Sequence, residues 1–141
     1  MFRSASPLEL VMVKGFEKNQ ERRQALGWLG KDLARRAHSK CELCEASGVK
    51  FKTVEIEPVP PEPDLGHCLL LCELCFEHIH RKGQPDDRYW RCLETAAWKE
   101  LPVVQVTAVR LLKAINVPWT ELLLEQLYIW PEAEAWLGLS D

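Results

Sequence analysis

The chain has 141 residues, of which 47% are hydrophobic, 28% are charged and six are tryptophan, and its formal net charge is −3. This length and composition suit one ordinary hydrophobic core and exclude a chain that is disordered throughout. Because we find no run of 18 apolar residues and no signal-peptide pattern, we expect a cytoplasmic protein with no membrane partner.

Charge is distributed unevenly along the chain. Residues 14–40 hold eight basic and three acidic residues, whereas the chain after Lys113 holds five acidic residues and no basic one. Such ends are typical of solvated helix faces, which could attract each other. A basic arm that contacts phosphate is the alternative, with Arg35 and Arg36 as its candidates, so a nucleic-acid partner stays open even though the small net charge disfavours general attraction.

The first predicted element is an amphipathic helix over residues 17–37. Its apolar residues recur at helical spacing, at Leu26, Leu29, Leu33 and Ala37. Gly27 and Gly30 each cost about 1 kcal/mol relative to alanine, so we expect that the helix could break there. Next come two strands, 51–57 and 67–72, which should form a hairpin around a loop that has four prolines in residues 58–63.

The remainder of the chain has a helical pattern. Asp86 or Asp87 can cap a helix through residues 87–98, and Pro102, Pro118 and Pro131 suit the first turns of three more helices. We therefore predict an α+β fold of three parts, in which a small zinc module packs on a mostly helical part. These parts are a basic N-terminal helical segment (1–38), a zinc-binding module (39–84) and a helical C-terminal part (85–141).

The tetrapeptide CELC occurs twice, as Cys41 to Cys44 and as Cys72 to Cys75, with 27 residues between the copies. Two such pairs can complete a tetrahedron of thiolates around one Zn²⁺, and a site with four protein ligands is structural because it has no open position. Binding of this kind contributes on the order of 10 kcal/mol to folding. A reducing compartment disfavours disulfides, while iron in the same cage stays open.

Other residues near these cysteines have weaker predicted roles. We interpret Cys68 and Cys92 as small buried side chains, and His78 and His80 as partner contacts rather than ligands, because four thiolates already saturate zinc. Trp90 and Trp98 are expected to pack over the zinc module. The remaining candidates for an anion or partner contact are Arg91 and Arg110.

A cysteine turn, a hairpin and a helix that begins at the last two ligands describe a treble clef or a zinc-ribbon hairpin. The segment LCELCFEHIH is similar to HNH-type nucleases that carry a cysteine zinc site. Those enzymes have a histidine pair on the hairpin, whereas here no histidine lies between Cys44 and His67. Glu55 and Glu57 could hold Mg²⁺, but such acids are common on strands, so we assign no catalytic residue.

A second resemblance covers residues 33–137. The segments LARRAHSKCELC, LLCELC, RYWRCLETAAWKELPVVQVTAVRLL and LLEQLYIWPEAEAWL resemble the PhnA family, which is named for its link to alkylphosphonate-utilisation operons. Its members often continue into a small SH3-like β-barrel, which we do not expect here because the sequence ends at Asp141. The basic N-terminal helix is a further departure from the shorter members.

We therefore predict a PhnA-like protein that acts as a non-catalytic binding module with one structural Zn²⁺ and a protein partner that the sequence does not identify. The alternative is a degenerate HNH-like treble clef that binds or cleaves nucleic acid. In that case the basic N-terminal helix would contact the nucleic acid.

Overall fold

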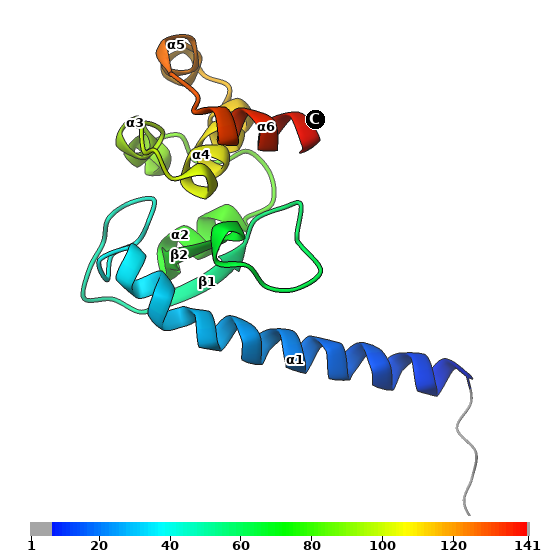
Figure 1. Cartoon of the computed structure of the whole chain (residues 1–141). Helices are drawn as coiled ribbons and strands as arrows, with labels where there is room; N and C mark the ends of the chain where they lie inside the picture. The colour runs from blue at the N-terminus through cyan, green and yellow to red at the C-terminus, as the bar shows by residue number, and fades with distance from the viewer. Residues whose placement is uncertain (1–6, 141) are drawn as a thin grey trace, which may run out of the picture.

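The computed structural model describes residues 7–140, and side chains within residues 19–138. Figure 1 shows a long rod, α1, on one side of a small sheet and a group of short helices on its other side. This mixture of helices with one small sheet confirms the coarse α+β prediction. The described elements are, in order, α1 (Pro7–Arg36), β1 (Phe51–Glu55), the 3-10 helix η1 (Leu65–His67), β2 (Cys68–Cys72), α2 (Glu73–Ile79), the 3-10 helix η2 (Tyr89–Cys92), α3 (Leu93–Ala96), α4 (Pro102–Ile115), α5 (Pro118–Gln126) and α6 (Pro131–Ser140).

The sheet is an antiparallel hairpin of β1 and β2. Phe51 pairs with Cys72 at one end of the ladder, and Glu55 pairs with Cys68 at the other. The predicted hairpin is therefore confirmed, with strands a little shorter than expected. The long loop between the strands begins after Glu55 because its prolines cannot donate ladder hydrogen bonds.

Strand β2 is buried on both faces, which explains its continuous apolar sequence. Leu69 and Leu71 belong to the main core, which includes α4. Cys68 and Leu70 point the other way and pack with Leu33 of α1 in a second cluster. Side chains alternate across a strand, so β2 carries one apolar row for each neighbouring layer. The hairpin is thus held between α1 and α4.

Helix α1 is continuous, and the expected break at its glycines is wrong. It passes through Gly27 and Gly30 without interruption. Leu33 is fully buried, and Leu26 and Leu29 pack beside it against the hairpin. Burial of these leucines offsets the helix propensity lost at the two glycines, which is about 1 kcal/mol each.

The end of α1 has the hydrogen bonds of a Schellman motif. The Ser39 N–H donates to the Ala34 carbonyl at 2.8 Å, and the His38 N–H donates to the Arg35 carbonyl at 3.3 Å. His38 and Ser39 have φ values of 55° and 57°, the left-handed conformation that glycine most often adopts at a helix end. This turn directs the chain back along the hairpin and into the first cysteine pair.

The C-terminal half begins at Asp86, whose carboxylate accepts hydrogen bonds from the Arg88 and Tyr89 N–H groups at 3.0 and 3.3 Å. The predicted helix over 87–98 is in fact two short pieces, η2 and α3. Helices α4, α5 and α6 do begin at the predicted prolines. A proline fits the first helical position because its missing N–H would have no helical partner there.

Gln105 is a fully buried polar residue at the centre of this helical part. Its Nε2 donates to the carbonyls of Ala97 and Tyr128, both at 2.9 Å, and its Oε1 accepts from the Trp130 N–H at 2.8 Å. One side chain of α4 therefore satisfies three backbone groups from two connecting segments. These hydrogen bonds explain why a buried polar residue is tolerated at this position of the PVVQV segment.

The two tryptophans expected over the cysteine module differ in burial. Trp90 is fully buried in the main core, whereas Trp98 is 45% exposed. The prediction is right for Trp90 and wrong for Trp98, because η2 and α3 do not form the single helix that would place both on one face. Among the described helices, none combines the length and the apolar character needed to cross a membrane.

Candidate metal centre

The first cysteine pair lies on a tight turn just after α1. The Cys41 N–H donates to the Ala46 carbonyl, and the Glu45 N–H donates back to the Cys41 carbonyl, both at 2.9 Å. Glu45 takes a left-handed conformation with φ of 66°. The turn brings the side chains of Cys41 and Cys44 to the same side of the backbone.

The second pair lies where β2 ends and α2 begins. Cys72 is the last residue of the strand and the N-cap of the helix, and Cys75 lies in the first helical turn. The Cys75 N–H donates to the Cys72 sulfur at 3.4 Å. A donor directed at a sulfur stabilises its thiolate, so this helix start suits a metal ligand.

The two turns gather all four cysteines into one cluster. The sulfurs of Cys41, Cys44, Cys72 and Cys75 all lie within 4.8 Å of one another, and the sulfurs of Cys44 and Cys72 are 3.6 Å apart. A tetrahedron with metal–sulfur bonds of 2.3 Å has sulfur–sulfur edges of about 3.8 Å. The predicted set is therefore arranged as a cage that could hold one metal ion.

The thiols of this cluster influence each other's acidity. Hydrogen bonding with Cys75 lowers the pKa of Cys41 to about 4, and the same bond raises the pKa of Cys75. Burial raises the pKa of Cys44 to about 12. Cys44 and Cys75 thus keep their protons at neutral pH unless a cation displaces them, so metal binding would release protons.

Tyr89 and His78 form a layer behind the cluster. The Tyr89 hydroxyl donates to the Cys75 sulfur at 3.1 Å, and the His78 ring stacks on Tyr89 with centroids 3.6 Å apart. Among the described residues, the four cysteines form the one group suited to a metal, and it does not include His78. Tyr89 therefore contacts a sulfur of the cluster from behind, and His78 packs on Tyr89, an outer layer of the kind common around metal sites.

The other predicted residues of this region lie apart from the cage. Cys68 is fully buried and Cys92 partly buried, and burial raises the pKa of both thiols to about 11. Cys68 is therefore the small buried side chain that the sequence predicted, whereas Cys92 packs against the main core and stays partly exposed. His80 donates from Nδ1 to the Phe76 carbonyl at 2.8 Å, which closes the end of α2.

The two CELC copies differ in which residues they bury. In the first copy Glu42 and Leu43 are 4% and 1% exposed. In the second copy Leu74 is 59% exposed and Glu73 is also exposed. Identical tetrapeptides thus present their two middle residues to the core in one case and to the surface in the other.

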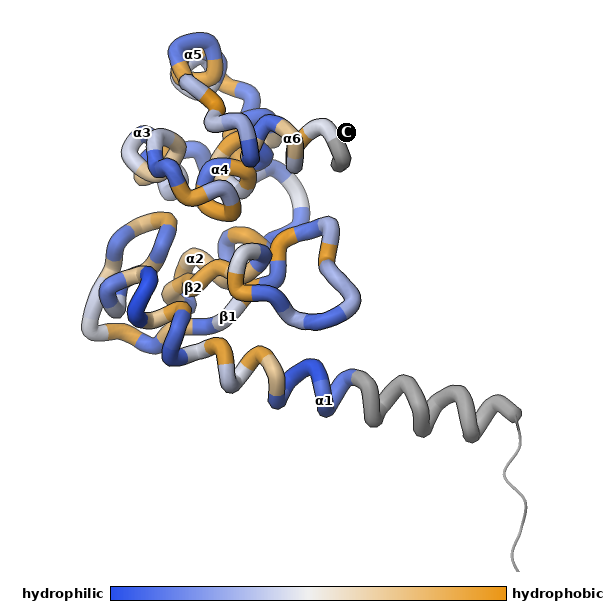
Figure 2. Tube along the Cα trace, viewed as in Figure 1, coloured by the Kyte–Doolittle hydropathy of each residue, from blue (hydrophilic) through white to orange (hydrophobic). Residues whose placement is uncertain are grey.

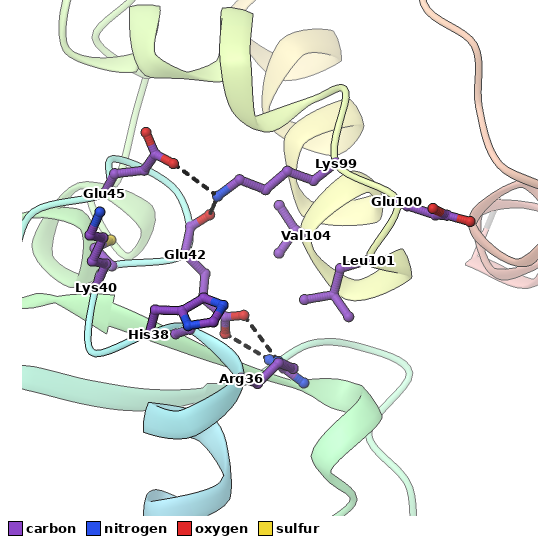
Figure 3. Close-up of a pocket in the computed structure, with 11 residues that line it drawn as sticks. Arg36, His38, Lys40, Glu42, Glu45, Lys99, Glu100, Leu101 and Val104 are labelled. Atoms are coloured by element: carbon purple, nitrogen blue, oxygen red, sulfur yellow. Dashed lines mark hydrogen bonds and ion pairs between the residues drawn. The ribbon is translucent and has the colours of Figure 1, made fainter.

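Glu42 joins three elements through its carboxylate. Arg36, in the last turn of α1, donates to both of its oxygens at 2.7 and 3.0 Å. The Leu70 N–H of β2 donates to Oε1 at 2.8 Å. Figure 3 shows this pair below the first cysteine turn. Arg36 is therefore engaged in an internal contact, and its predicted role toward a partner stays a prediction.

A cavity of about 490 Å³ lies between the first cysteine turn and the start of α4. Leu101 and Val104 form its apolar wall, and Lys99 reaches across it (Figure 3). The Lys99 ammonium donates to the Glu42 carbonyl at 3.0 Å and lies 3.8 Å from a Glu45 oxygen. These contacts tie the cysteine turn to the helical part.

The other predicted contact residues also have intramolecular partners. Arg91 pairs with Glu94 at 2.6 Å and stacks over Trp119. Arg110 donates to the Glu57 carbonyl at 2.7 Å. By contrast, the side chain of Arg35 is 81% exposed and only loosely paired.

Of the two carboxylates considered for Mg²⁺, Glu55 and Glu57, Glu55 already has a cationic partner within the chain. Glu55 accepts a hydrogen bond from Arg22 Nε at 2.8 Å, and Arg22 also donates to the carbonyls of Pro60 and Pro61, both at 2.9 Å. This arginine of α1 fixes the proline-rich loop against the hairpin. Glu55 is therefore already neutralised by a cation from within the chain.

Sequence reasoning missed two residues that the structure makes prominent. Glu42 could not be distinguished from Glu73, because their local sequences are the same. Trp28 is 77% exposed on α1 and could have been found on a helical wheel. At 100° per residue it lies about 140° from Leu33, and so away from the hairpin.

Comparison of the chain with protein-family models, with curated proteins and with solved structures gives no significant match. The fold and the cage define the class as an α+β chain of helices and one small sheet with a four-cysteine cluster suited to one metal ion.

Proposed function

We propose that this chain is a binding module in which the four clustered cysteines hold one structural Zn²⁺ and no reaction is catalysed. The supporting observation is the cage itself, in which the four sulfurs lie within 4.8 Å of one another. Four thiolates fill the tetrahedron, so substrate or water has no coordination position.

The position of the cage supports a structural role. It joins the first cysteine turn to the end of β2 and the start of α2, segments that are about 30 residues apart in the chain. Three of its cysteines are buried, and they contribute to the main core. An ion there would stabilise the hairpin and both turns at once, in a fold whose sheet has two strands.

Metal analysis of the purified chain tests this proposal. We expect about one zinc per chain, and cobalt substitution should give the absorption bands of a tetrahedral tetrathiolate site. Cys41→Ser and Cys75→Ser should lose the ion and the cobalt spectrum, while the matched control Cys92→Ser should keep both. Stoichiometric iron with a red tetrathiolate spectrum would refute zinc, and a metal-free folded chain would refute the structural ion.

Membership of the PhnA family remains part of the proposal. It depends on the sequence segments described above. Release of phosphate from simple alkylphosphonates would contradict the non-catalytic part of the proposal, because it would require a reactive group that we have not assigned.

One alternative has its own support. The order β1, β2, α2, with ligands at the start of α2, is the arrangement expected of an HNH-like treble clef. Glu55 of this hairpin is paired with Arg22, which disfavours a catalytic metal there. Mg²⁺-dependent nicking of plasmid DNA that disappears in His78→Ala would favour the nuclease, and no nicking by the zinc-loaded protein would exclude it.

A further inference from the structure

The outer face of α1 carries an exposed aromatic side chain. Trp28 is 77% exposed, although tryptophan is among the residues most buried on average. It lies on a helix whose opposite face packs on the hairpin through Leu33. Within residues 19–138, no packing contact accounts for an indole at that position.

Basic side chains lie next to this indole. At 100° per residue, Arg35 and Lys31 lie about 20° and 60° from Trp28 around the helix, on the same side, with Gln24 between them at about 40°. All three are exposed. Along the helix axis, Lys31 and Arg35 are about 5 and 10 Å from Trp28 at 1.5 Å per residue. We call these four residues the Trp28 surface.

The cations of the Trp28 surface are available for a ligand. Among the described residues, Lys31 has no ion pair. Arg35 lies 3.8 Å from Asp32, and both side chains are more than half exposed, so this pair contributes little. The acids nearest to Trp28, Glu21 and Asp32, lie at about 20° and 40° on its other flank, so the two cations lie together on one flank of the indole.

The residues around Trp28 argue against an apolar partner. A partner groove for a helix needs a row of apolar anchors at i, i+3, i+4 and i+7, and a membrane needs a whole apolar face. The positions three, four and seven residues from Trp28 are Glu21, Gln24, Ala25, Lys31, Asp32 and Arg35. Five of these six are polar or charged, so Trp28 is an isolated aromatic platform.

An isolated aromatic beside cations fits single-stranded nucleic acid. Unpaired bases stack on aromatic rings, and neighbouring cations bind the phosphates. We propose that the Trp28 surface binds single-stranded RNA or DNA by stacking one base on Trp28 and placing phosphates at Lys31 and Arg35. This inference names the partner class of the proposed binding module and rests on it. The acidic helices α5 and α6 lie on the far side of the molecule (Figure 1), where they do not oppose such a strand.

The test uses the full zinc-loaded chain and fluorescence anisotropy with labelled 15-nucleotide poly(U) and poly(dT). At 50 mM salt, Trp28→Ala should weaken binding by at least about fivefold, the low end for loss of one stacked base, and Trp28→Phe should restore most of it. The double variant Lys31→Glu, Arg35→Glu should make the salt dependence shallower by about 1.4 in slope, because two phosphate contacts are lost.

Two controls separate this inference from the proposed function. Trp98→Ala, at the other prominently exposed tryptophan, should bind as the wild type does. Metal content is measured for the wild type and for every variant. A zinc-deficient wild type would count against the proposed function. A zinc-loaded wild type that binds neither oligonucleotide would overturn the nucleic-acid inference alone. Equal binding by Trp28→Ala, or Trp28-dependent binding to phosphatidylserine vesicles without oligonucleotide binding, would also overturn it.

Discussion

Replacing Glu42 by alanine is expected to lower the free energy of unfolding by about 3 kcal/mol, while the same change at Glu73 should alter it by less than about 0.5 kcal/mol. Breaking a buried ion pair costs roughly 3–5 kcal/mol because the remaining charge loses its partner. The low end applies here, since Arg36 keeps its hydrogen bonds to the carbonyls of Leu65 and Cys68 at 2.8 and 2.6 Å. Substitutions at exposed positions such as Glu73 rarely change the free energy of unfolding by more than about 0.5 kcal/mol.

Urea unfolding measures both variants, with free zinc held at one concentration because a bound metal shifts apparent stability. Circular dichroism and tryptophan fluorescence should give the same midpoint if the transition has two states. Combining Glu42→Ala with Arg36→Ala should cost less than the sum of the single changes, since they share one interaction. Equal losses for Glu42→Ala and Glu73→Ala would refute the distinction between the two CELC copies.

Three further changes test the packing. Gln105→Leu should destabilise the chain by about 3 kcal/mol, because three backbone groups, one buried and two part-buried, lose their partner at the low end of roughly 1–3 kcal/mol each. A loss below about 1 kcal/mol in urea unfolding would contradict this. Gly27→Ala should stabilise by about 1 kcal/mol, since an added methyl meets no atom within 4 Å; a lower urea midpoint would count against it. The pKa of Cys68 is raised to about 11 by burial, so the stability that its neutral thiol contributes is present below pH 9 and is lost as pH rises toward 11. The free energy of unfolding of the wild type should therefore fall more than that of Cys68→Ala between pH 8 and pH 10. Parallel plots of unfolding free energy against pH would argue against the raised pKa of Cys68.

Local patterns predicted those features that local geometry determines. The spacing of Cys41, Cys44, Cys72 and Cys75 was sufficient to predict the cage, because a two-residue interval on a tight turn brings two sulfurs together. The continuous apolar run of β2 likewise predicted a strand, and the structure buries all five of its residues. Prolines marked the starts of three helices because their backbone fits the first helical position.

The features that sequence reasoning missed depend on neighbours distant in the chain. Helix α1 does not break at Gly27, since the packing of Leu33 in tertiary structure outweighs a local propensity. Glu42 is buried because α1 provides Arg36 and β2 provides an N–H group, whereas Glu73 is exposed at the start of α2. Equal tetrapeptides therefore cannot reveal which copy carries the buried carboxylate.

The contact between Glu42 and Arg36 links the cage to α1. Cys41 and Cys44 flank Glu42, so an ion bound between the two cysteine turns would fix the carboxylate that holds the last turn of α1. In Figure 2 the coloured part of α1 is hydrophilic near its label and alternates between hydrophobic and hydrophilic where the helix reaches the sheet. Removal of the ion should therefore loosen α1, and with it the Trp28 surface, even though no ligand of the ion lies on that helix.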